Sequence, residues 1–205
     1  GFKNNFELIH NGFDTKFYLP RKNFKRQNFD LRKDQIIIGN VARYHPVKNH
    51  DYLLSIFNQI KNFPNIKLIL IGTNVNKTNS QLLRKLKYYN IQDKVILLGR
   101  RDDVFHIYKL FDIFILTSKS EGFPNVLAEA MLNNNICYST DVGEASLILR
   151  RKNFIIPKDD VIKSARIIQN MINQKNSYKW KRIKKENKTH IMNSFSLKKM
   201  VINYL

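Results

Sequence analysis

Hydrophobic and polar positions divide the chain into two kinds of segment. Short runs that are almost wholly apolar predict buried strands, and longer runs with apolar residues three or four positions apart predict amphipathic helices. The predicted strands cover residues 35–42, 67–72, 94–99, 112–118, 136–140 and 153–157. The predicted helices cover residues 51–62, 80–89, 103–111, 124–133, 144–149 and 160–172, and residues 176–205 are expected to be helical or partly helical with a basic face.

The alternation of strands and helices predicts βα units, and therefore a parallel sheet covered on both faces. Six such strands fit a single doubly wound, Rossmann-like α/β domain. In this fold, ligands bind beyond the carboxyl ends of the strands. The loops at those ends begin at Arg43, Gly72, Gly99, Ser118 and Asp141, and we expect a binding site among them.

The composition is that of a folded protein with a large positive charge. The 205 residues are 43% hydrophobic and include 14 Phe, which favours a packed core over a disordered chain. The formal charge of +20 predicts attraction to polyanions such as nucleic acid, an anionic membrane or phosphorylated ligands. A general bias towards Lys, Asn and Ile would raise the charge without any function, and this alternative stays open.

Three further features bear on the cellular compartment of the protein and on whether the chain is part of a longer one. Cys137 is the single cysteine, which excludes an internal disulfide and suggests a reducing compartment. No apolar run approaches the roughly 18 residues that span a bilayer. Residues 1–10 do not resemble a signal peptide and the chain lacks an initiator Met, so we expect a piece of a longer protein.

The stretch SKSEGFPNVLAEAM (118–131) places two glutamates around the start of a helix. Pro124 suits a first helical turn, and Gly122 lets the backbone approach a ligand. The free N–H groups of such a helix end attract phosphate. Glu121 precedes the helix and Glu129 lies about 7 Å along its axis, so the two carboxylates could hold a sugar on each side of a diphosphate. A capped helix with two ordinary surface glutamates would fit the same spacing.

Two cations follow the first predicted strand, at the same end of the sheet. Arg43 and Lys48 could neutralise a diphosphate there, Arg by bidentate contact and Lys as a point charge. Among 36 Lys and Arg residues, this pair alone carries little weight. His45 and His50 are expected to be solvated residues of the loop and helix start, not metal ligands.

Taken together, these segments resemble the C-terminal, donor-binding domain of the family 4 retaining glycosyltransferases, within the glycosyl transferases group 1. The resemblance rests on HNGFDTKFYLP, VARYHPVKNHDYLL, KLILIG, LFDIFILTSKSEGFPNVLAEAM and YSTDVGEASLIL, which occur in the family's order. It implies the C-terminal half of a B-type glycosyltransferase fold, with a nucleoside-diphosphate sugar bound at the strand ends.

The resemblance also implies a role for each site residue. Arg43 and Lys48 would bind the diphosphate and stabilise the leaving group, and Glu121 would contact the transferred sugar, so these three are the expected catalytic residues. Glu129 would bind the ribose hydroxyls. The remaining expected donor contacts are Gly72, Gly99, Arg100, Gly122, Phe123, Pro124, Asn125 and Val126. No metal or other cofactor is expected.

The sequence departs from the family pattern at two places near these residues. Gly72-Thr73-Asn74 stands where the family usually has Gly-x-Gly, which puts the nucleobase or phosphate edge in doubt. Glu144 replaces the second Gly of a frequent pair, so contacts on the sugar or acceptor side are also in doubt.

We expect three parts in the chain. Residues 1–30 form a lead-in, with one short strand and a turn, from a missing N-terminal domain; residues 31–190 form the nucleotide-sugar domain; residues 191–205 form a closing helix. The donor is expected to be a UDP- or GDP-sugar, and the acceptor a glycan, lipid-linked or lipid molecule bound through the missing domain in cell-surface polysaccharide synthesis. The expected location is cytoplasmic, with peripheral contact to the inner face of the membrane.

Two other functions compete with this interpretation. A nucleic-acid binder is suggested by the basic segments 21–26, 150–152 and 179–188, the first and last of which contain an aromatic residue. They are dispersed and no recognition motif accompanies them, so no nucleic-acid partner is expected. A sugar-nucleotide-binding module without catalysis is not separated by sequence from half of an enzyme. A dinucleotide-binding domain is excluded because no G-x-G-x-x-G follows any strand.

Overall fold

The chain folds around one parallel sheet. The structure is a computed structural model that describes residues 9–14 and 24–205. The sheet has six strands in the order β3-β2-β1-β4-β5-β6, and every neighbouring pair is parallel, which confirms the predicted doubly wound fold. The strands are β1 Ile36–Val41, β2 Ile66–Ile71, β3 Val95–Leu97, β4 Ile113–Leu116, β5 Ile136–Thr140 and β6 Ile155–Ile156.

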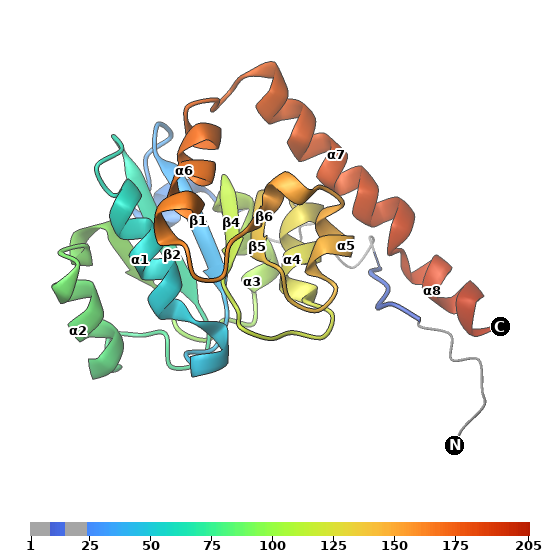
Figure 1. Ribbon diagram of the computed structural model, residues 1–205, viewed down its shortest axis with the longest axis horizontal. Coiled ribbons are helices and arrows are strands. Elements are labelled where there is room, and N and C mark those ends of the chain that lie inside the picture. The colour runs from blue at the N-terminus through green and yellow to red at the C-terminus, as the bar shows by residue number, and fades with distance from the viewer. Residues whose placement is uncertain (1–8, 15–23) are drawn as a thin grey trace.

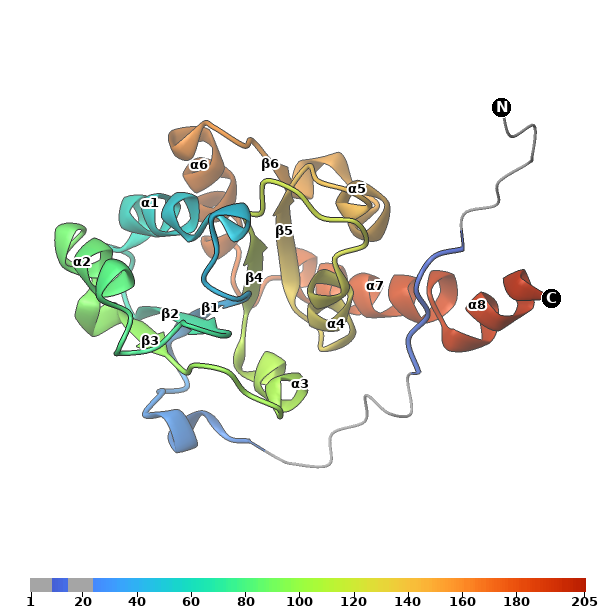
Figure 2. The ribbon, with the colours of Figure 1, turned by 90° about the horizontal axis from the view of Figure 1, so that it is seen from below.

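Helices cover both faces of this sheet (Figures 1 and 2). Figure 2 shows α1, α2 and α6 on one side of the sheet and α3 on the other. Helix α4 packs against α7, and α1 against α6. The helices are α1 His50–Ile60, α2 Ser80–Tyr88, α3 Val104–Ile107, α4 Asn125–Leu132, α5 Ala145–Leu149, α6 Val161–Ile172, α7 Tyr178–Ser194 and α8 Leu197–Tyr204.

The continuous apolar run of β1 is explained by the burial of both faces of the strand. Ile37 and Ile38 point to opposite faces of β1 and both are fully buried, so the strand is a continuous apolar run.

Two predicted elements are shorter than expected. The edge strand β6 has only two residues because Lys152–Phe154 forms a 3₁₀ turn, and the helix expected at 103–111 is α3 followed by a 3₁₀ turn over Tyr108–Leu110. Both tight turns bring the chain to the start of the next strand.

The strand order creates a switch point at the centre of the sheet. The chain runs outward from β1 to β3, returns to pair β4 with β1, and then runs outward to β6. At such a switch the loops after the two central strands separate and leave a crevice. Residues 43–48 and 118–125, which follow β1 and β4, therefore lie next to each other.

The two ends of the described chain meet beside α8 (Figure 1). Phe13 forms a parallel bridge with Ser196, and its N–H donates to the carbonyl of Phe195 at 2.8 Å. A strand and a turn are expected in residues 6–20, of which the structure describes 9–14, with this bridge; residues 6–8 and 15–20 lie outside the described residues. Helix α7 continues through residue 190, where the domain boundary is expected, and the closing helix begins at Leu197. No helix among the described residues is long and apolar enough to cross a membrane.

Candidate functional site

A hollow of about 490 Å³ lies at the carboxyl ends of β1 and β2, beside the loop that follows β4. It brings together most residues predicted from the sequence. Its walls include Arg43, Lys48, Gly72, Arg100, Glu121, Phe123, Pro124, Asn125 and Val126. The predicted residues Gly99, Gly122 and Glu129 are not part of its lining.

Lys48 and Glu121 form an ion pair in the wall of this hollow. The Lys48 Nζ lies 2.6 Å from Oε1 and 2.8 Å from Oε2 of Glu121, and the Ser118 hydroxyl donates to Oε1 at 2.6 Å. The two charged side chains are 23% and 13% exposed, so the pair is largely shielded from water. The sequence predicted both residues at one end of the sheet, but nothing in it indicated that they bind each other.

Hydrogen bonds between the two central loops hold Lys48 in this place. The Thr117 hydroxyl, at the end of β4, contacts the carbonyls of Lys48 at 3.3 Å and Asn49 at 3.1 Å. The Lys119 N–H donates to the carbonyl of Val47 at 2.7 Å. Asn49 has a φ of 51°, in the left-handed region that Asn tolerates better than most residues. The loop after β1 is therefore fixed from the β4 side.

Arg43 is exposed at the rim of the hollow. Its side chain makes no hydrogen bond or ion pair with any other residue that the structure describes, so its guanidinium can take up an anion. The adjoining backbone is closely packed, since the Tyr44 N–H donates to the carbonyl of Thr73 at 2.8 Å. At Gly72 a Cβ would lie 2.1 Å from the Ala42 carbonyl oxygen, and its φ of 150° also disfavours other residues. Glycine is required there.

The N-terminus of α4 opens into the hollow. The helix begins at Asn125, one residue later than predicted, and Pro124 occupies the position before it without a side-chain cap. Pro124, Asn125 and Val126 all line the hollow. An uncapped helix start presents free N–H groups and the positive end of the helix dipole, which together favour a phosphate.

Glu129 is the fifth residue of α4, as predicted, but lies deeper than Glu121. It is largely buried and accepts a hydrogen bond from the Tyr108 hydroxyl at 3.0 Å. Burial raises the pKa of Glu129, and the Tyr108 hydrogen bond partly offsets that rise. The two glutamates that the sequence paired therefore have different surroundings: Glu121 is held by a cation, and Glu129 by a neutral hydroxyl.

The lining also contains residues that the sequence analysis did not select. Thr73 follows β2, and Arg101 and Val104 follow β3. Arg101 makes a bidentate contact with Asp103, with both N–O distances at 2.8 Å. The run Arg-Arg-Asp-Asp at 100–103 could have identified Arg101 from the sequence, because charged residues directly after a strand are candidates for lining the crevice at the strand ends.

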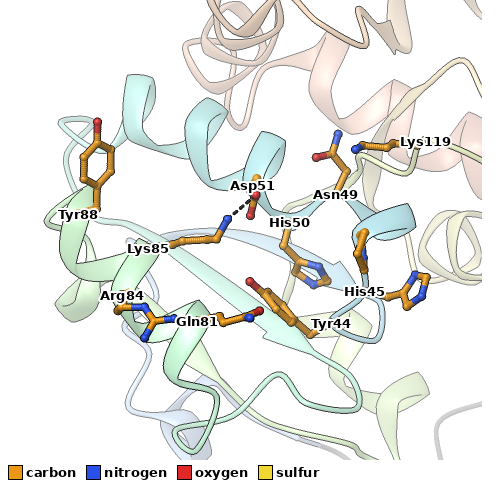
Figure 3. A pocket seen from close by; sticks show the side chains of 11 residues that line it. Tyr44, His45, Asn49, His50, Asp51, Gln81, Arg84, Lys85, Tyr88 and Lys119 are labelled. Atoms are coloured by element: carbon orange, nitrogen blue, oxygen red, sulfur yellow. Dashed lines mark ion pairs between the residues drawn. The ribbon is translucent and has the colours of Figure 1, made fainter.

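A second, larger hollow of about 800 Å³ lies between the N-terminal part of α1 and helix α2. Its walls include Tyr44, His50, Asp51, Arg84 and Lys85, which Figure 3 shows around the opening. Lys85 forms an ion pair with Asp51, and the hydrogen bond that Lys85 donates to the Asp51 carboxylate raises the pKa of Lys85. The Arg84 side chain has no partner among the described residues.

His50 corrects one prediction, because it is not a solvated residue. It is 3% exposed, packs against the ring of Tyr44 with centroids 5.3 Å apart, and neither ring nitrogen makes a hydrogen bond. Burial lowers the pKa of His50 to about 4, while Asp51 and the Ala42 backbone act in the opposite direction. Within the described part of the chain, no group of three or more His, Cys, Asp or Glu side chains could hold a metal ion.

Known proteins share both the sequence pattern and this fold. The family model described as glycosyl transferases group 1 matches residues 21–190. The chain is 29% identical over 137 residues to the glycosyltransferase EpsF of Bacillus subtilis, covering 65% of this chain and 35% of that protein. It is 25% identical over 167 residues to the UDP-Gal:alpha-D-GlcNAc-diphosphoundecaprenol alpha-1,3-galactosyltransferase of Escherichia coli, covering 75% of this chain and 42% of that protein. Among solved structures, Anabaena HepE in complex with UDP and glucose is similar with a TM-score of 0.84 and 21% identity, covering 97% of this chain and 55% of that one.

These matches fix the class of the protein. The chain spans less than half the length of either curated relative. The likeness to HepE shows a shared fold, that of half of a B-type glycosyltransferase. The family match includes both loops that form the hollow at the centre of the sheet. The chain belongs to the glycosyl transferases group 1 family.

Proposed function

We propose that this chain is the donor-binding half of a retaining glycosyltransferase and binds a nucleoside-diphosphate sugar in the hollow at the ends of β1, β2 and β4. One observation carries the proposal: Arg43, Lys48 and the uncapped N-terminus of α4 converge on a single hollow of about 490 Å³. Two cations and a helix end are the groups that recognise a diphosphate.

Each group has a task in the proposed reaction. Arg43 and the helix N–H groups hold the diphosphate, and Lys48 neutralises the charge that develops on it as the bond to the sugar breaks. Glu121 can accept hydrogen bonds from sugar hydroxyls once Lys48 turns towards the phosphate. We expect transfer with retention of the anomeric configuration, which proton NMR of the product anomer would test in a longer chain that also binds the acceptor.

The relatives support a choice of donor and acceptor. The Escherichia coli relative is named for UDP-galactose and a diphosphoundecaprenol-linked sugar, and HepE has been solved with UDP. We therefore propose a UDP-sugar as the donor, with GDP-sugars as the alternative. The proposed acceptor is a glycan or lipid-linked glycan in cell-surface polysaccharide synthesis. It would be bound by the part of the relatives that this chain does not span.

The proposed reaction uses no metal ion. The charges of Arg43 and Lys48, together with the α4 dipole, supply the positive potential that a divalent cation gives in other phosphate sites. Binding and transfer should therefore be unchanged by a chelator. A loss of UDP affinity in EDTA that Mg²⁺ restores would remove this part of the proposal.

Calorimetric titration of the 205-residue chain tests the donor site itself. UDP or GDP should bind saturably with one site, and inorganic pyrophosphate more weakly because it lacks the nucleoside. The same ligands should raise the unfolding temperature, since a ligand that binds only the folded state stabilises it. Saturable binding of neither nucleotide at millimolar concentration would exclude the proposed function.

A peripheral membrane location follows from the proposed acceptor and is also a proposal. Helix α7 exposes Lys179, Lys181, Arg182 and Lys185, and basic residues near an anionic surface contribute about 1 kcal/mol each. Flotation with liposomes at physiological salt tests this. Recovery of the protein with anionic vesicles should exceed recovery with neutral ones. Equal recovery would mean that the positive charge reflects compositional bias and not membrane binding.

A further inference from the structure

The turn that precedes α4 is held from two sides. On its inner side, the Glu144 N–H donates to the carbonyl of Gly122 at 2.9 Å, and the Ser118 hydroxyl contacts Glu121. On its outer side it makes contacts with two segments that are far away in sequence. These segments are residues 9–14, near the start of the described chain, and residues 195–200, which join α7 to α8.

Phe123 makes the outer contact through an aromatic cluster formed by His10, Phe13, Phe123 and Phe195. The ring of Phe123 lies edge-on to Phe195 with centroids 5.4 Å apart, and lies 6.0 Å from His10 and 6.3 Å from Phe13. Phe13 and Phe195 are 3% and 4% exposed, so the cluster is packed and dry on that side. Such ring pairs stabilise beyond the area they bury.

Polar contacts reinforce the cluster. The Asn11 side-chain amide donates to the Asn125 side chain, at the first residue of α4, over 3.0 Å. The two distant segments also bind each other, since Phe13 N–H donates to Phe195 and Leu197 N–H donates to Phe13 at 3.0 Å. At Gly12 a Cβ would lie 2.7 Å from the Met200 Cβ, so only glycine allows this close approach.

We infer that Phe123 is a positioning residue, and that the paired segments 9–14 and 195–200 set the position of the turn 121–125 in the donor site. This inference rests on the proposed donor site. Phe123 lines the hollow, but its ring packs against residues outside the site. Loosening the paired segments would move Glu121 and the N-terminus of α4 relative to Arg43.

Thermodynamic linkage makes this testable in the unaltered chain. If separating the two segments weakens UDP binding by some factor, then UDP must disfavour their separation by the same factor. The amides of Phe13 and Leu197 report the separation, because both are hydrogen-bonded between the segments. Saturating UDP should slow their hydrogen exchange by about five-fold, the size expected from one aromatic pair.

Matched variants complete the experiment. Phe195→Leu removes a ring contact of Phe123 and should lower UDP affinity by about five-fold and abolish the effect of UDP on exchange. Asn11→Ala removes a surface hydrogen bond, should fold normally, and should lower affinity by about two-fold. Phe57→Leu is the control, because Phe57 is a fully buried residue of α1 outside the cluster. It should lower stability and leave UDP binding unchanged.

The outcomes separate this inference from the proposed function. If the unaltered chain binds UDP but its exchange at Phe13 and Leu197 does not change, the positioning role is wrong and the donor site stands. Equal loss of affinity in Phe57→Leu and Phe195→Leu would also overturn it, since the cause would be general destabilisation. If neither UDP nor GDP binds the unaltered chain, the proposed function and this inference both fail.

Discussion

The hollow at the strand ends and the hollow between α1 and α2 contain similar residues and differ in what surrounds them. Each has a lysine paired with a carboxylate, and an arginine whose side chain has no partner among the described residues. These are Lys48, Glu121 and Arg43 in the hollow at the strand ends, and Lys85, Asp51 and Arg84 in the one between α1 and α2. The second hollow is larger, at about 800 Å³ against 490 Å³. Only the first lies at the switch point of the sheet, where the loops after β1 and β4 meet; the second is bordered by the start of α1.

If the proposed donor site is correct, the number of charges and the size of a cavity are poor guides to binding in this protein. The pair in the strand-end hollow is held by backbone contacts from both central loops, and its side chains are 23% and 13% exposed. The pair between α1 and α2 is 35% and 60% exposed. The first can hold a charge in a fixed direction with little screening by water, and the second cannot.

The largest effect is expected in the hollow between α1 and α2, and concerns stability. Because burial lowers the pKa of His50 to about 4, the folded state binds its proton less readily than the unfolded state, whose pKa is near 6.5. His50 therefore contributes nothing to the pH dependence above pH 6.5 and destabilises the folded protein progressively down to about pH 4. The loss amounts to about 3 kcal/mol.

His50→Leu should remove this loss. Urea unfolding at pH 7, 5.5 and 4.5 would show a smaller fall in the free energy of unfolding for the variant than for the unaltered chain. UDP affinity at pH 7 should stay the same. An identical pH dependence in both proteins would show that His50 binds its proton equally well in the folded and the unfolded state.

Replacing Arg43 and Arg84 by alanine, one at a time, tests the comparison most directly. Arg43→Ala should weaken UDP binding by about 10- to 100-fold, because a charge-assisted hydrogen bond to the diphosphate is lost. Arg84→Ala removes the same charge from the other hollow and should have almost no effect. Titration calorimetry at one fixed salt concentration measures both. Equal losses would mean that UDP responds only to the net charge of the protein.

The two ion pairs should differ in their value for stability. Lys48→Met leaves the shielded carboxylate of Glu121 without its cation and should cost about 1–3 kcal/mol, whereas Lys85→Met breaks an exposed pair and should cost less than about 1 kcal/mol. Chemical denaturation of both variants at pH 7 provides the measurement. Lys48→Met should also bind UDP less tightly than Lys85→Met. The reverse order would place the stronger site between α1 and α2.

Glu129→Gln is expected to have the smallest effect, and it discriminates between ligands. If Glu129 binds ribose hydroxyls, the variant should bind UDP about five-fold more weakly and bind pyrophosphate as before. If the affinities for both ligands fall equally, Glu129 has a structural role with Tyr108.

The pH dependence of stability gives a second measurement on the same variant. Burial raises the pKa of Glu129, so its ionisation lowers the free energy of unfolding as pH rises above 4.5, and Glu129→Gln should lack that decrease.

The fold and the meeting of Arg43, Lys48 and the α4 start could be predicted from the sequence, because each depends on a periodic pattern or on the rule that strand ends share one edge. The Lys48–Glu121 pair could not, since it depends on how Thr117 and Lys119 hold the loop after β1. His50 was misplaced for the same reason. A polar residue at a helix start is usually exposed, and the packing of His50 against Tyr44 is a tertiary contact that no sequence pattern indicates.

The aromatic cluster was also beyond sequence reasoning. Phe13 and Phe195 stand near opposite ends of the chain, and no periodic pattern links them to Phe123. The short strand expected near Phe13 indicated an extended segment, but its partner was not predictable. The residues that fix a site from outside carry no local signal, because their role depends on tertiary contacts alone.

The contact between Lys48 and Glu121 spans 73 positions of the chain and so affects how the protein folds. During synthesis the loop with Arg43 and Lys48 emerges long before β4, so Lys48 cannot contact Glu121 until β4 pairs with β1. A diphosphate ligand finds its full set of contacts only after this pairing. Such a ligand stabilises the finished fold more than any earlier state, so it should slow unfolding while leaving the refolding rate almost unchanged.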